Sequence, residues 1–80
     1  MSKHRKLIEK FKYCEGQFPW KDLVILLEHL GFVRIEGAGS RVSFDNGVVL
    51  IKLHKPHPQK EVKAYAVKQV KRILLFEDLI

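Results

Sequence analysis

The pattern of hydrophobic and polar positions predicts helices at both ends of the chain and strands between them. Residues 6–14 carry apolar side chains at helical spacing, which predicts a short helix ending near Gly16. Residues 20–30 hold the clearest apolar stripe, formed by Leu23, Leu26, Leu27 and Leu30. Pro19 suits the start of this helix because its missing N–H costs nothing there, and Gly31 is a natural stop.

The middle of the chain favours β-structure. A short β-rich segment at 32–36 is followed by a Gly-Ala-Gly turn and by two further segments, at 41–45 and 48–55. Asn46-Gly47 between these two is the preferred pair for a two-residue type I′ hairpin turn. Pro56 and Pro58 then end the last strand, because proline cannot donate to a ladder.

A two-residue turn also predicts the register of the hairpin, with Arg41 opposite Lys52. One face of the hairpin is then apolar and should cover the core: Val42, Phe44, Val49, Ile51 and Leu53. The other face should be open to solvent: Arg41, Ser43, Leu50, Lys52 and His54. Because the alternation is consistent in both strands, the division into faces is well specified.

A third helix is expected to start between residues 62 and 64 and to continue into residues 74–78. Its predicted apolar stripe is Val62, Tyr65, Ala66, Val70, Ile73 and Leu74. The predicted fold class is α+β: two N-terminal helices, a three-stranded antiparallel sheet and a C-terminal helix, with the helices on one face of the sheet. This is the layout of double-stranded-RNA-binding domains. Trp20 and Tyr65 could stack on the bases of single-stranded RNA, but both are interpreted as core or core-edge residues.

Length and composition limit the alternatives. Eighty residues, 46% of them hydrophobic, are enough for one modest core. We therefore expect a single domain over residues 1–80, with an N-terminal extension helix in 1–17 and a core in 18–80. The lone Cys14 cannot form an intrachain disulfide, which favours a reducing, cytoplasmic location. No apolar run approaches the roughly 20 residues of a membrane span, so no membrane association is predicted.

The formal net charge of +6 favours an anionic partner. On the predicted open face, Arg41, Lys52 and His54 gather two cations and a titratable ring, which indicates a phosphate-bearing partner, most plausibly RNA. A splayed, solvated pair of like charges is the alternative interpretation. His54 and His57 are three residues apart without supporting cysteines, so the sequence predicts neither a metal site nor a cofactor.

The run Phe18-Pro19-Trp20-Lys21-Asp22-Leu23-Val24-Ile25-Leu26-Leu27-Glu28-His29-Leu30-Gly31-Phe32, with Gly39-Ser40 opening a strand, resembles the HicA family of toxins from toxin–antitoxin pairs. The resemblance implies the double-stranded-RNA-binding fold and metal-independent endoribonuclease activity on mRNA. It also implies a HicB-like antitoxin that masks the active site. The family's catalytic histidine directly follows the Gly-Ser pair, where this chain has Arg41.

Arginine cannot act as a general base near neutral pH, so the missing histidine must be replaced if the chain is catalytic. His54 is the leading catalytic candidate, because the predicted register brings it roughly opposite Gly39, and His57 is the second. Histidine suits proton transfer because its unperturbed pKa is about 6.5. The predicted RNA and phosphate contacts are Ser40, Arg41, Ser43, Lys52 and Lys55.

Two other interpretations stay open. The chain could be a non-catalytic RNA-binding domain that has lost the histidine, or a domain whose basic face binds an acidic protein such as the antitoxin. RNA cleavage would separate the first hypothesis from both, and salt-dependent RNA affinity would separate the two alternatives.

Overall fold

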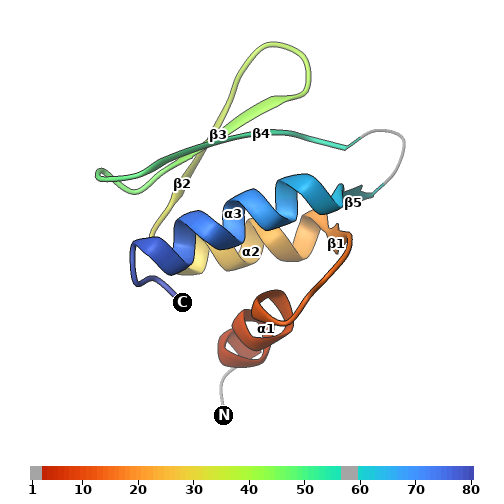
Figure 1. Ribbon diagram of the computed structural model, residues 1–80. Helices are drawn as coiled ribbons and strands as arrows, with labels where there is room; N and C mark the ends of the chain where they lie inside the picture. Colours follow the sequence, from red (N-terminus) through yellow and green to blue (C-terminus); the bar gives the residue numbers. More distant parts are fainter. Residues whose placement is uncertain (1–2, 57–59) are drawn as a thin grey trace.

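The computed structural model describes residues 3–56 and 60–80. Figure 1 shows the arrangement of the helices and strands in this part of the chain. The helices are α1 (Lys3–Lys12), α2 (Trp20–His29) and α3 (Ala64–Phe76). The strands are β1 (Phe18–Pro19), β2 (Val33–Glu36), β3 (Arg41–Asp45), β4 (Leu50–His54) and β5 (Glu61–Val62).

The centre of the fold is an antiparallel sheet in the order β2-β3-β4, and α2 and α3 lie together on one side of it (Figure 1). The sheet contributes four buried side chains to the core, Val42, Phe44, Ile51 and Leu53. The helices contribute the stripes of α2 and α3, among them Leu23, Leu26, Leu27, Val67, Val70 and Leu74. The predicted α+β fold of the double-stranded-RNA-binding type is therefore confirmed.

The end of α2 shows why the sheet begins where it does. Gly31 has a φ of +97°, which an L side chain rarely adopts, and its amide donates to the Glu28 carbonyl at 3.1 Å. The Phe32 amide donates to the Leu27 carbonyl at 3.0 Å. These two bonds form a Schellman motif, which ends the helix and turns the chain directly into β2.

The hairpin between β3 and β4 differs from the prediction in its register. The structure pairs Arg41 with His54 and Asp45 with Leu50, so a four-residue loop, 46–49, replaces the expected two-residue turn. The reason is local: the Asn46 side-chain oxygen accepts bonds from the Val48 and Val49 amides, at 2.9 and 2.6 Å. Side chains of this type offer the backbone an alternative to a regular hairpin turn.

The change of register amounts to two residues, so the residues of β3 and β4 keep their predicted faces. Val49, which was predicted on the core face, lies instead in the loop and is half-buried. Side chains alternate with a period of two along a strand, and only an odd shift exchanges the faces. Val42, Phe44, Ile51 and Leu53 are buried as expected, and Arg41, Lys52 and His54 are exposed.

A second, two-stranded sheet was not predicted. Strand β1 pairs antiparallel with β5, Phe18 opposite Val62, and the Trp20 amide donates to the Lys60 carbonyl at 2.9 Å. Each strand has only two residues, which is too short for an alternation of apolar and polar positions to be recognised in the sequence. The pairing fixes the start of α3 beside the start of α2, and thereby places the first turn of α3 near the end of β4.

The apolar stripe of α3 also differs from the prediction, which included Tyr65, omitted Val67 and assigned Val62 of β5 to the helix. The fully buried residues are Val67, Val70 and Leu74, whereas Tyr65 is 69% exposed. At about 100° per residue, Tyr65 lies about 140° to 200° around the helix from all three. Tyr65 therefore points away from the core, and its interpretation as a core residue is wrong. Trp20, by contrast, is buried and meets Phe44 edge-on, with ring centroids 6.1 Å apart.

The N-terminal helix α1 packs on α2, on the side away from the main sheet (Figure 1). Its Phe11 is fully buried and contacts the Phe18 ring at a centroid distance of 5.1 Å. In the residues that the structure describes, no helix is both long enough and apolar enough to cross a membrane.

Candidate nucleic-acid interface

The face of the main sheet opposite the helices carries three rows of side chains across β2, β3 and β4. The strand registers define the first two rows as Val33, Asp45 and Leu50, then Ile35, Ser43 and Lys52, and the third row as Arg41 and His54 on β3 and β4. The first two rows begin with exposed apolar side chains, and the third row ends with a guanidinium and an imidazole. We call Arg41, Lys52 and His54 the basic cluster.

Arg41 and His54 are direct neighbours across the hairpin. The Lys55 amide donates to the Ser40 carbonyl at 2.7 Å, so Ser40 and Lys55 form a hydrogen-bonded pair. Such pairs alternate along an antiparallel ladder, so the next pair, Arg41 and His54, is a non-hydrogen-bonded one. Side chains approach most closely in these pairs, whose Cβ atoms are about 4.5–5.5 Å apart.

The structure thus brings three of the predicted site residues together and corrects how they meet. Lys52 lies opposite Ser43, one row from Arg41, rather than directly opposite Arg41 as predicted. His54 lies opposite Arg41 rather than Gly39. The like-charge pair inferred from sequence is therefore absent from the described hairpin, and a guanidinium next to an imidazole takes its place.

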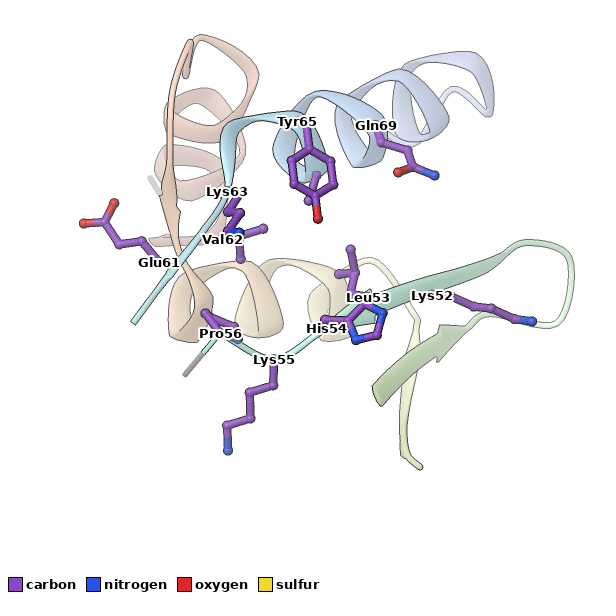
Figure 2. A pocket seen from close by; sticks show the side chains of 11 residues that line it. Lys52, Leu53, His54, Lys55, Pro56, Glu61, Val62, Lys63, Tyr65 and Gln69 are labelled. Atoms are coloured by element: carbon purple, nitrogen blue, oxygen red, sulfur yellow. The ribbon is translucent and has the colours of Figure 1, made fainter. Parts of the chain in front are cut away.

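The other predicted residues are less central. Ser40 lies in the turn before β3 and joins Lys55 through the backbone bond alone. Lys55 is exposed and extends away from Tyr65 in Figure 2. His57 falls outside the described residues, so its part in the site stays a prediction.

A cleft of about 580 Å³ lies between β4 and the start of α3, beside the basic cluster. We call it the edge cleft. Its walls include Lys52 and His54 from β4, Lys63 before α3, and Tyr65 and Gln69 from α3 (Figure 2). The volume falls within the range of about 300–1,000 Å³ that is usual for small-ligand sites.

Electrostatics make the edge cleft suitable for an anion. Three lysines line it, Lys52, Lys55 and Lys63, against one carboxylate, Glu61, which Figure 2 shows directed away from the opening. The first turn of α3 contains no acidic residue, and no side chain caps its amides. Since the N-terminus of a helix carries partial positive charge, this end of α3 adds to the positive potential.

Metal ligands are a separate question. Within residues 3–56 and 60–80, no group of three or more His, Cys, Asp or Glu side chains is placed so that it could hold a metal ion.

Comparison with known families identifies the group to which the sequence is related. The family model of the HicA toxin of bacterial toxin–antitoxin systems matches residues 20–74, from the start of α2 to near the end of α3. This chain belongs to the HicA family. It is accordingly a toxin of a toxin–antitoxin pair, and the resemblance carried by α2 and Gly39-Ser40 is confirmed. Comparisons with curated proteins and with solved structures gave no match.

Membership of the HicA family allows Arg41 to be compared with the residue that the family has at this position. The family pattern expects a histidine after Gly39-Ser40, and the structure shows His54 as the cross-strand neighbour of that position. An imidazole therefore stands beside the place where the family's own would project. The basic cluster places an imidazole and two cations on one exposed surface.

Three residues of the edge cleft were not among the predicted site residues: Lys63, Tyr65 and Gln69. For Tyr65, base stacking was the alternative to a place in the core. They lie near or within the first two turns of α3, and their approach to β4 depends on the pairing of β1 with β5. The helical spacing alone could have indicated that Tyr65 is exposed, because it places Tyr65 on the side of the helix away from Val67, Val70 and Leu74.

Proposed function

We propose that this HicA-family toxin is a metal-independent endoribonuclease that binds and cleaves mRNA in the cytoplasm. The observation that carries the proposal is the pairing of His54 with Arg41, at the position of the family's missing histidine. Lys52 on the next row and Lys63 across the edge cleft add the positive charge that an RNA backbone requires.

In the proposed reaction, the ribose 2′-hydroxyl attacks the adjacent phosphorus. The new bond joins O2′ to phosphorus, and the bond from phosphorus to O5′ breaks, leaving a 2′,3′-cyclic phosphate and a 5′-hydroxyl. Neutral His54 removes the 2′-hydroxyl proton, and a protonated histidine, His54 itself or His57, returns a proton to O5′. Arg41 and Lys52 stabilise the charge that develops on the pentavalent phosphorus.

The test is cleavage of a fluorescent single-stranded RNA by pure protein in the presence of EDTA. His54→Ala should lower the rate by roughly 10²- to 10⁴-fold, the usual contribution of a general acid or base. His29→Ala is the matched control, because His29 ends α2 outside both the basic cluster and the edge cleft. His57→Ala, measured alongside, assigns the second proton carrier.

An undiminished rate in His54→Ala would rule out this assignment. If the wild-type protein binds RNA and yields no fragments, the chain is instead a non-catalytic binding domain, and Arg41 marks the lost activity.

We further propose that a HicB-like antitoxin covers the open face of the sheet. Val33, Ile35 and Leu50 are 64%, 50% and 52% exposed there, next to the basic cluster. An acidic partner with an apolar centre would match both features. Ile35→Asp should weaken the antitoxin complex at least tenfold. The matched control, Ile25→Asp, places the same charge on α2, at a residue 41% exposed. Equal effects of the two variants would contradict the proposed interface.

A further inference from the structure

Tyr65 has the largest side chain that lines the edge cleft, and the proposed reaction does not use it. It is 69% exposed, although an aromatic ring normally gains stability by burial. Figure 2 shows the ring projecting from α3 toward β4, with its hydroxyl on the β4 side. Tyr65 also lines a second hollow, together with Lys68 and Lys71, so the ring stands between two basic surfaces.

The opposite wall of the edge cleft presents backbone groups of β4. Strand β4 pairs only with β3 among the described residues, so β4 forms one edge of the sheet. Because Ser40 and Lys55 are a hydrogen-bonded pair, the N–H and C=O groups of Lys52 and His54 point away from β3, toward the outer edge. This edge therefore presents donors and acceptors suited to the edge of a nucleobase.

We infer that the edge cleft is a nucleobase-binding subsite, in which Tyr65 stacks on one base of a single-stranded RNA while the outer edge of β4 contacts that base. Gln69, one turn along α3, offers an amide that can both donate and accept. His54 belongs to both the edge cleft and the basic cluster, so a base on Tyr65 holds its phosphate near the imidazole. The inference rests on the proposed function, since it names the RNA feature that the same site recognises.

Stacking needs an unpaired base, which predicts a preference for single strands over duplexes. The requirement is for an aromatic ring rather than for bulk or for the hydroxyl group. Substitutions at Tyr65 can therefore separate stacking from a structural role.

The experiment measures binding of a fluorescein-labelled 2′-O-methyl RNA of about twelve nucleotides, which cannot be cleaved, as a single strand and as a duplex. Tyr65→Ala and Tyr65→Leu should weaken single-strand binding by about 5- to 150-fold, and Tyr65→Phe should stay within about twofold of wild type. The dependence of affinity on salt should not change, because no charge is removed, whereas Lys63→Ala should lower its slope by about 0.7.

The matched control is Tyr13→Ala, because Tyr13 is 77% exposed and does not line the edge cleft. Thermal melting checks that each variant is folded. Equal single-strand affinity in wild type, Tyr65→Ala and Tyr65→Leu overturns the inference, as does equal loss on single strand and duplex.

The cleavage assay keeps the two proposals distinguishable. Loss of affinity in Tyr65→Ala, with no cleavage by the wild type, would support the subsite and reject the nuclease. Cleavage by the wild type, with unchanged affinity in Tyr65→Ala, would do the reverse.

Discussion

Position 41 is where this chain departs from its family, and its neighbour shows how the site can be rebuilt. An arginine there can hold a phosphate but cannot exchange protons near neutral pH. His54 stands directly across the hairpin, so an imidazole lies beside the position from which the family's own would project.

The proposed catalytic role of His54, next to position 41, predicts a rescue by a histidine at that position. In a His54→Ala background, Arg41→His should restore RNA cleavage to within about tenfold of wild type, because the new imidazole lies next to the lost one. The measurement is the single-turnover cleavage rate, with Arg41→Lys in the same background as the control that keeps the charge. A double variant as inactive as His54→Ala alone would show that the two positions are not equivalent.

Among the structural elements, the hairpin of β3 and β4 decides which site residues meet, and its loop sets the register. Asn46 accepts two amide bonds, and the Asp45 carboxylate accepts a third from Gly47 at 2.7 Å. These bonds stabilise the four-residue loop that brings His54, instead of Lys52, opposite Arg41.

Removal of the Asn46 acceptor should therefore be measurable. Asn46→Ala is expected to reduce the free energy of unfolding by about 0.5–1.5 kcal/mol, which lowers the melting temperature by a few degrees. Asn46→Asp keeps an acceptor oxygen and is expected to stay close to wild type. Thermal melting followed by circular dichroism gives both values. Identical melting of Asn46→Ala and wild type would mean that these bonds add nothing to the loop.

In the same hairpin, the sequence was sufficient to predict the two faces but not the register. The alternation of apolar and polar residues was sufficient to assign Phe44 to the core and His54 to the open face, since the faces depend only on parity. The register was not predictable, because it depends on bonds between the Asp45 and Asn46 side chains and nearby amides. The position of Tyr65 was missed because it depends on a two-residue pairing between distant segments.

At the scale of the whole molecule, the N-terminal helix shares the hydrophobic core. The division into an extension at 1–17 and a core at 18–80 stays a prediction, and Phe11 is the residue that tests it. Its ring is fully buried, against Phe18 and below the Lys71 ammonium group, which lies 5.9 Å from its centroid.

Phe11→Ala should destabilise the protein by about 3–5 kcal/mol, because it leaves a cavity where a large side chain was packed. This is a large part of the stability of a domain of this size. Tyr13→Ala, on an exposed residue just after α1, should change stability by less than about 0.5 kcal/mol. Chemical denaturation of both variants measures the difference. A negligible effect of Phe11→Ala would mean that residues 18–80 fold independently of α1.

The central claim is that RNA binds the open face and the edge cleft, with its phosphate between Arg41 and His54. The most direct measurement is a titration of isotope-labelled protein with the non-cleavable single-stranded RNA, followed by backbone and side-chain NMR shifts. We expect the largest shifts at Arg41, Lys52, His54, Lys63 and Tyr65, with little change in α1. Shifts confined to α1 and the exposed side of α2, with the basic cluster unmoved, would contradict the account.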